Sequence, residues 1–183
     1  MSPDPSVSGP RRTILVVDDD QGMRETLRII LDSDHRVLLA DTGEIALQIL
    51  SREAIDAMLL DVQLPGMDGL GVLRLVKQRY PLTEIIMISA VAEQETVMEA
   101  ITVGAYHFIK KEFEYDTVRT LVQKAIDRRD LEQEVIALTP HIRRARDAKF
   151  RELFLLYCQL DAGARLSIDR EIERLHRTRL MTG

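Results

Sequence analysis

The stretch AMLLDVQLPGMDG, residues 57–69, decides how the chain is expected to fold. Its apolar beginning, preceded by Asp56 and followed by the turn-forming Pro65 and Gly66, is typical of a strand buried on both faces of a parallel sheet. The strand carries one carboxylate, that of Asp61, to its carboxyl end, where open α/β sheets keep their functional groups. Aspartate is also favoured at the start of turns, so Asp61 alone is equally compatible with a plain turn.

Other apolar segments with strand character lie on both sides of this one. They are TILVV (13–17), RVLLA (36–40), EIIMIS (84–89) and YHFIK (106–110). Stretches with helical spacing of apolar residues follow each strand, and the third of these helices is expected from about Leu70 to Tyr80. Gly104 is a good terminator for the fourth. Five strand and helix pairs joined by short loops predict an α/β fold with a doubly wound parallel sheet.

The spacing also predicts which side of each helix faces the sheet. The predicted core positions are Met23, Leu27, Ile30 and Leu31 in the first helix, Ile45, Ala46, Ile49 and Leu50 in the second, Val97, Ala100 and Ile101 in the fourth, and Val118, Leu121, Val122, Ala125 and Ile126 in the last.

Composition limits the class of protein. A chain of 183 residues, 45% hydrophobic, is long enough for one well-buried domain and an appendage. Its single cysteine, Cys158, cannot form an internal disulfide, and no apolar run approaches the ~20 residues of a membrane helix. We therefore expect a cytoplasmic protein with no membrane association. The chain has no Walker-type glycine loop, CxxC pair or HExxH motif, which excludes the commonest nucleotide-binding and zinc-binding sites.

Polar residues end four of the predicted strands. Three acids (residues 18–20) follow the first strand, Asp61 ends the third, Ser89 ends the fourth and Lys111 follows the fifth. Each has a plain alternative: Asp20 is the expected N-cap of the first helix, Ser89 suits a turn, and Lys111 suits a solvated surface. Together they form the kind of acid, hydroxyl and lysine set that binds phosphate and a divalent metal.

Four motifs in order carry a resemblance to a known family: ILVVDDD, LLDVQLPGMDG, IIMISA and GAYHFIKKEF. With these motifs, residues 13 to about 127 resemble the receiver domain of two-component response regulators. The resemblance implies a flavodoxin-like sheet with strand order 2-1-3-4-5. It also implies that Asp61 is phosphorylated by a sensor histidine kinase or a phosphotransfer protein. Such a domain is not a separate enzyme; it assists its own phosphoryl transfer and hydrolysis.

The resemblance assigns parts to the other site residues. Asp19, Asp61 and the backbone carbonyl of Gln63 are expected to bind Mg²⁺ directly, with Asp18 acting through water. Adjacent carboxylates repel one another unless a cation neutralises them, and Mg²⁺ prefers such oxygen ligands. In the family, the residue at the place of Lys111 contacts the phosphoryl oxygens.

The resemblance implies that two further residues change position on phosphorylation. In the family, the hydroxyl at the position of Ser89 moves toward the phosphate, and the aromatic ring at the position of Phe108 turns inward. The motif spacing selects Lys111 over Lys110 as the site lysine. One departure concerns Glu112, because the family commonly has proline there, often after a cis bond. A cis peptide before a non-proline residue costs ~3 kcal/mol, so we expect a trans bond before Glu112.

We divide the chain into a disordered leader (1–12), a receiver domain (13–127) and a helical extension (128–183). The extension has a sparse apolar line at residues 131, 135 and 138. Further on, its predicted apolar stripe consists of Phe150, Leu153, Phe154, Tyr157 and Leu160. Helices of this kind are typical of dimerisation or of docking to a protein target.

The preferred hypothesis is a response regulator that signals through protein contacts, as a homodimer or with a target bound by the extension. A transcription regulator with a helical DNA-binding tail is the first alternative, although the extension has only a small excess of basic residues. A phosphatase of the haloacid dehalogenase type is the second. It would need a nucleophile at Asp18 and a further acidic pair near the fourth strand, which the sequence lacks.

Overall fold

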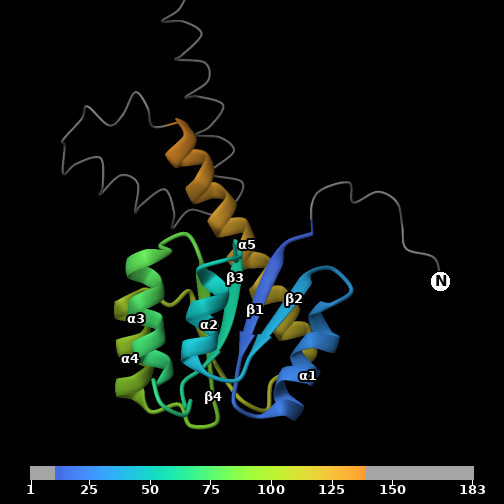
Figure 1. The fold of residues 1–183 in the computed structure, drawn as a ribbon, viewed down its shortest axis with the longest axis vertical. Coiled ribbons are helices and arrows are strands. Elements are labelled where there is room, and N and C mark those ends of the chain that lie inside the picture. The colour runs from blue at the N-terminus through green and yellow to red at the C-terminus, as the bar shows by residue number, and fades with distance from the viewer. Residues whose placement is uncertain (1–10, 139–183) are drawn as a thin grey trace, which may run out of the picture. The chain divides into compact units, whose positions relative to one another are not determined.

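The computed structural model describes residues 11–138, in which strands and helices alternate (Figure 1). In chain order the elements are β1 (Thr13–Val17), α1 (Gln21–Leu31), β2 (Arg36–Ala40), α2 (Gly43–Leu50), β3 (Ala57–Asp61), α3 (Gly69–Arg79), β4 (Glu84–Ser89), α4 (Gln94–Val103), β5 (His107–Lys110) and α5 (Tyr115–Leu138). The strands form one parallel sheet in the order β2-β1-β3-β4-β5. The predicted α/β fold and strand order are confirmed.

The sheet has a hydrophobic core on each face. Helices α1 and α5 cover one face, and α2, α3 and α4 cover the other (Figure 1). Strand β3 shows the alternation: Met58 and Leu60 belong to the core under α2, α3 and α4, whereas Ala57 and Leu59 belong to the core under α1 and α5. Because β1 and β3 are buried along their whole length, their carboxyl ends are held rigidly at the middle of the sheet edge.

The helix faces agree with the predicted spacing at most positions. In α1 and α5 every predicted core residue is buried or partly buried. Two positions were wrong: Ile45 in α2 is 39% exposed and Ile101 in α4 is 46% exposed. Each lies next to an alanine, Ala46 or Ala100, that is fully buried and takes the central contact. Ile45 and Ile101 thus lie at the margin of the buried face of their helices, so the buried stripe is narrower than the spacing suggests.

Local signals fix the ends of two helices as predicted. Asp20 is the N-cap of α1, where its Oδ1 accepts a hydrogen bond of 3.0 Å from the backbone N–H of Met23. Gly104 ends α4 in the left-handed conformation at φ 115°, which a residue without Cβ adopts at little cost. The cap at Asp20 directly follows Asp18 and Asp19 at the end of β1.

The amino edge of the sheet carries buried acids paired with basic side chains of α5. Arg129 Nη1 lies 2.6 Å from Asp56 Oδ1, and Arg128 Nε lies 3.2 Å from Glu84 Oε1. Lys77 of α3 pairs with the second oxygen of Glu84 at 3.2 Å. These contacts attach α5 to the sheet well past its first turns.

The chain divides into two compact units, residues 1–134 and 135–183, with the division inside α5. The predicted stripe of residues 150–160 and the leader up to residue 10 lie outside the described residues. The proposed boundaries of leader, receiver and extension stay predictions. No helix described between residues 11 and 138 is long and apolar enough to cross a membrane.

His35, a buried residue immediately before β2, makes the stability of the fold depend on pH. Burial lowers the pKa of its imidazole, although Asp34 acts to raise it. As the pH falls through the ordinary histidine value of 6.5, the unfolded chain takes up a proton that the folded chain resists. The free energy of unfolding should therefore fall on acidification, and His35→Gln should reduce that fall.

Urea unfolding at a series of pH values between about 7.5 and 5.5 measures this dependence across the histidine range. His107→Gln, which changes an exposed histidine, is the control for loss of an imidazole at the surface. Equal pH dependence in the parent chain and in His35→Gln would contradict the prediction.

Candidate functional site

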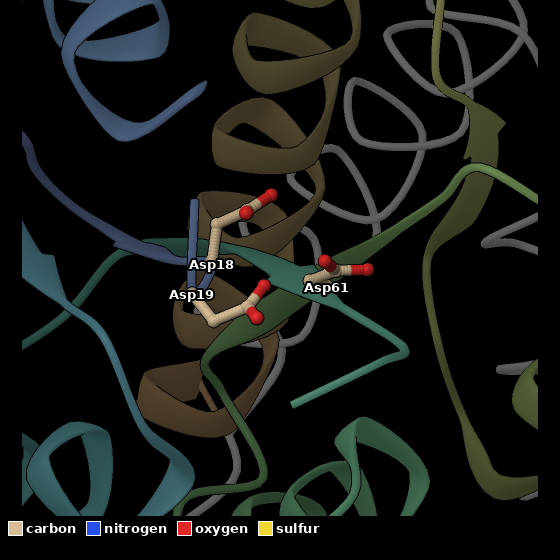
Figure 2. A group of neighbouring side chains, drawn as sticks. All are labelled: Asp18, Asp19 and Asp61. Atoms are coloured by element: carbon tan, nitrogen blue, oxygen red, sulfur yellow. The ribbon is translucent and has the colours of Figure 1, made fainter. Parts of the chain in front are cut away.

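The register of the sheet brings three carboxylates together. Val17 of β1 lies opposite Leu60 of β3, so the residues that follow them, Asp18 and Asp61, leave the sheet side by side. Figure 2 shows Asp18 and Asp19 at the end of β1, next to Asp61 at the end of β3. One oxygen from each of the three carboxylates lies within 4.8 Å of the others. Sequence positions more than 40 residues apart thus form one acidic cluster at the carboxyl edge.

Lys111 provides the positive charge of the cluster. Its Nζ donates a hydrogen bond of 2.7 Å to Asp61 Oδ2 and lies 3.0 Å from Asp18 Oδ2. The backbone N–H of Lys111 donates to the carbonyl oxygen of Ser89 at 2.7 Å, which extends the pairing of β4 and β5 by one residue. Lys110 is exposed instead. The structure therefore brings Lys111, the lysine selected from the motif spacing, to the acids.

Burial and charge oppose each other in this cluster. Asp18 and Asp61 are both buried, whereas Asp19 is exposed. Burial raises the pKa of Asp18, and the Lys111 ammonium and the backbone N–H of Asp20 act against that rise. Burial acts to lower the pKa of Lys111, but its contacts with Asp61 and Asp18 outweigh burial and raise it. Removal from water therefore dominates the shift of Asp18, whereas the neighbouring carboxylates dominate the shift of Lys111.

The cluster fits a divalent cation. Three carboxylates face one lysine, so the charges do not balance when all the acids are ionised. Among residues 11–138, no donor forms an aligned hydrogen bond to the buried Asp18 Oδ2, although Lys111 Nζ lies 3.0 Å away. A buried oxygen with spare acceptor capacity, beside other carboxylates, suits a hard cation that prefers oxygen ligands.

The remaining predicted residues lie around this cluster in less direct positions. The backbone N–H of Gln63 donates to Asp61 Oδ1 at 3.2 Å, which places Gln63 beside the site. The buried Ser89 hydroxyl is engaged with its own loop: it donates to the carbonyl of Val91 at 2.7 Å and accepts from the N–H of Val91 at 3.2 Å. Phe108 is partly buried and packs against the core under α2, α3 and α4.

The loop after Lys111 departs from ordinary backbone geometry. Among the described residues no peptide bond is cis, so the bond before Glu112 is trans, as expected. Glu112 nevertheless has a φ of 78°, the one left-handed non-glycine residue between residues 11 and 138. A proline, whose ring holds φ near −65°, could not adopt this conformation. Glutamate at this position therefore allows a backbone conformation that proline would exclude.

One residue near the site was missed from the sequence. Arg24 on the first turn of α1 donates from Nη1 to the carbonyl oxygens of Asp18, at 2.7 Å, and Asp19, at 2.9 Å. The available signal was its place four residues after the capping Asp20, where a helix returns a side chain to the side of its own N-terminus. An arginine on an exposed helix turn is ordinary, and so the pattern alone did not identify it.

Comparison with known proteins agrees with this geometry. Residues 14–123 match the family model of the response regulator receiver domain. The chain belongs to this family. The receiver domain is therefore the part of the molecule that contains the three carboxylates, Ser89 and Lys111. The match supports neither the phosphatase alternative nor the DNA-binding one.

Several relatives share the receiver domain. An NtrX-like response regulator of Rickettsia bellii is 38% identical over 128 residues, which is 68% of this chain and 27% of the relative. The crystal structure of NtrX from Brucella abortus in complex with ADP has a TM-score of 0.67 and 34% identity, covering 70% of this chain and 30% of NtrX. A CheY-like receiver domain protein of Methanospirillum hungatei has a TM-score of 0.65 and 25% identity, covering 67% of this chain and 99% of its own. The chain thus spans about a quarter of the length of the curated relatives that it matches.

The left-handed conformation of Glu112 can be tested with two variants. Glu112→Gly should be more stable than Glu112→Ala by about 1 kcal/mol, because only glycine adopts a positive φ without a clash at Cβ. Both variants remove the same carboxylate, so the difference between them reports on the backbone. Urea unfolding measures it, and an alanine variant at least as stable as the glycine variant would contradict the assignment.

Proposed function

We propose that this receiver domain is a phosphoacceptor and that Asp61 accepts the phosphoryl group from a phosphohistidine of a sensor kinase or of a phosphotransfer protein. The observation that carries the proposal is the position of Lys111 Nζ, which lies within 3.0 Å of both Asp61 and Asp18. A nucleophilic carboxylate, a fixed cation and neighbouring acids that can hold a metal are the parts that phosphoryl transfer requires.

Transfer consists of one bond made and one bond broken. A carboxylate oxygen of Asp61 attacks phosphorus, the phosphorus–nitrogen bond to the donor imidazole breaks, and the imidazole leaves with its electron pair and takes up a proton. The two oxygens of Asp61 are not equivalent, since Oδ2 is bound by Lys111 and Oδ1 by the Gln63 N–H. These contacts orient the carboxylate before the donor arrives, which is most of what such a site contributes.

Asp18, Asp19, Asp61 and the backbone carbonyl of Gln63 would hold Mg²⁺. The bound ion would offset the negative charge of the entering phosphoryl group and of the carboxylates around it. Asp19 is exposed and gives the ion a route from solvent, whereas Asp18 is buried behind it. Lys111 would exchange part of its contact with Asp61 for the phosphoryl oxygens.

The hydroxyl of Ser89 would couple phosphorylation of Asp61 to a change at the surface, by forming a hydrogen bond to a phosphoryl oxygen. In the unphosphorylated chain it is bound to Val91, so it must leave those two hydrogen bonds to reach a phosphoryl oxygen. Phe108 is partly buried on the neighbouring strand β5, and its ring would turn inward in the phosphorylated state. Phosphorylation would therefore shift the population between two arrangements of the loop after β4 and of β5.

The receiver domain would not be a separate enzyme. It would assist its own phosphoryl transfer and hydrolysis, and would signal through protein contacts. The partner would be a second copy of the chain or a protein target, and it would bind to the helical extension. The apolar line of this extension begins within α5, where Leu131 and Val135 are both partly buried.

Phosphorylation can be tested directly with a small-molecule donor. Incubation of the chain with acetyl phosphate and Mg²⁺ should add the mass of one phosphoryl group, and Asp61→Asn should reduce that adduct by at least ~100-fold because the amide is not a nucleophile. Removal of Mg²⁺ by a chelator should also lower the yield. Intact-mass spectrometry measures each result.

Asp41→Asn is the matched control, since it neutralises an exposed aspartate just after β2, at the same edge of the sheet. This control should be phosphorylated like the parent chain. A phosphoryl adduct in folded Asp61→Asn equal to that of the parent chain would overturn the proposal.

A further inference from the structure

The acidic segment after β1 is held by one residue of α1. The Nη1 atom of Arg24 donates to the carbonyl oxygens of Asp18 and Asp19, and the backbone N–H of Arg24 donates to the carbonyl oxygen of Asp20 at 3.0 Å. Three consecutive carbonyl oxygens therefore accept hydrogen bonds from the same arginine. The side chain of Arg24 makes these contacts while partly buried, where they are stronger than at a fully exposed surface.

These hydrogen bonds fix the planes of two peptide groups. In a trans peptide the C=O and N–H groups point in opposite directions, so holding the oxygen also aims the hydrogen. The carbonyl of Asp19 points to Arg24, and the N–H of the same peptide, which belongs to Asp20, donates to Asp18 Oδ1 at 2.9 Å. With Oδ1 bound in this way, Asp18 presents Oδ2 to Lys111 at 3.0 Å.

We propose that Arg24 is a positioning residue for the metal cluster: it acts through the backbone of residues 18–20 to hold the carboxylates of Asp18 and Asp19 in the arrangement that receives a divalent cation. This inference rests on the proposed function of the site. Arg24 acts on the outer side of the acidic segment and is not expected to touch the phosphoryl group. Its guanidinium is suited to the task because Nη1 carries two hydrogens, one for each carbonyl.

A purely structural role for Arg24 predicts a different effect of its loss on Mg²⁺ affinity. If the arginine only stabilised the start of α1, its loss would lower the free energy of unfolding and leave metal affinity unchanged in the folded chain. If it positions the acids, the peptide between Asp19 and Asp20 gains freedom when it is lost, and Asp18 loses a fixed donor. Removing a residue that orients metal ligands typically lowers metal affinity ~10–100-fold.

The test measures Mg²⁺ binding to the unphosphorylated chain by calorimetry or by amide chemical shifts. Arg24→Gln should weaken Mg²⁺ binding at least ~10-fold. Arg24→Lys, which keeps a charged donor without the planar fork, should recover part of the affinity. Arg28→Gln is the matched control, because it removes an arginine one turn further along α1 whose partner is Glu25, and it should bind Mg²⁺ like the parent chain.

Hydrogen exchange of the Asp20 amide gives a second readout that needs no metal. Its exchange should be faster in Arg24→Gln than in the parent chain, because the peptide plane is no longer held. If Arg24→Gln does not fold, Arg24→Lys carries both measurements, with weaker binding and faster exchange than the parent expected. Mg²⁺ affinity within ~2-fold of the parent in a folded Arg24→Gln, with unchanged exchange at Asp20, would overturn the inference.

This experiment separates the inference from the proposed function. Loss of Mg²⁺ affinity in Arg24→Gln together with an unphosphorylated parent chain would retain the positioning residue and reject the phosphoacceptor. Normal Mg²⁺ affinity in Arg24→Gln together with phosphorylation at Asp61 would retain the phosphoacceptor and reject the positioning residue. Absence of Mg²⁺ binding by the parent chain would overturn the inference whatever the result at Asp61.

Discussion

The bridge from Lys111 to Asp61 and Asp18 is the interaction on which the site depends. Two buried carboxylates side by side repel each other and are separated from water, so they need a cation within reach. Lysine meets this need with one compact charge that can contact both oxygens and can later move. The order of the sheet makes the contact possible, since β1 and β3 are neighbours and Lys111 approaches from the far side of β4.

The two edges of the sheet differ in how their buried acids are paired with basic side chains. At the amino edge, Asp56 is paired with Arg129, and Glu84 is paired with Lys77 and Arg128. These acids have partners from the covering helices: the arginines attach α5 to the sheet and Lys77 attaches α3. At the carboxyl edge, within residues 11–138, three carboxylates gather and Lys111 pairs with two of them.

At the carboxyl edge the carboxylates outnumber the lysine paired with them, and a bound metal ion would supply the missing positive charge. A cluster in which every carboxylate is paired with a basic side chain has no net negative charge to attract a further cation. A cluster that keeps a net negative charge attracts one. The rigid burial of β1 and β3 keeps the carboxylates in place despite their repulsion, with the two hydrophobic cores of the domain stabilising the arrangement.

Much of the site could be predicted from the sequence because it lies at strand ends. Strands buried on both faces are readable as apolar runs, and parallel topology gathers their last residues at one edge. This reasoning predicted the positions of Asp18, Asp61 and Ser89 at the carboxyl edge, and motif spacing selected Lys111, which lies against the acids, over the exposed Lys110. It extended to the N-cap at Asp20 as well, because capping follows local chemistry.

The rest depends on three-dimensional contacts that no local pattern records. The exposure of Ile45 and Ile101 depends on how each helix is rotated against the sheet, which here buries the neighbouring Ala46 and Ala100 instead. The hydrogen bonds from Arg24 to the carbonyl oxygens of Asp18 and Asp19 depend on the direction of its side chain at the first turn of α1. The left-handed conformation of Glu112 follows from the path of its loop, since glutamate has no preference for a positive φ.

The central claim, that Lys111 is the cation which the acidic cluster shares with an incoming metal, is tested by the Mg²⁺ affinity of Lys111→Met. Methionine keeps much of the length of the side chain and removes its charge, so Mg²⁺ would no longer compete with an ammonium for Asp61 and Asp18. The variant should be less stable than the parent chain without metal, should bind Mg²⁺ more tightly, and should gain more in melting temperature on its addition. Mg²⁺ binding that is unchanged or weaker in folded Lys111→Met would contradict the account.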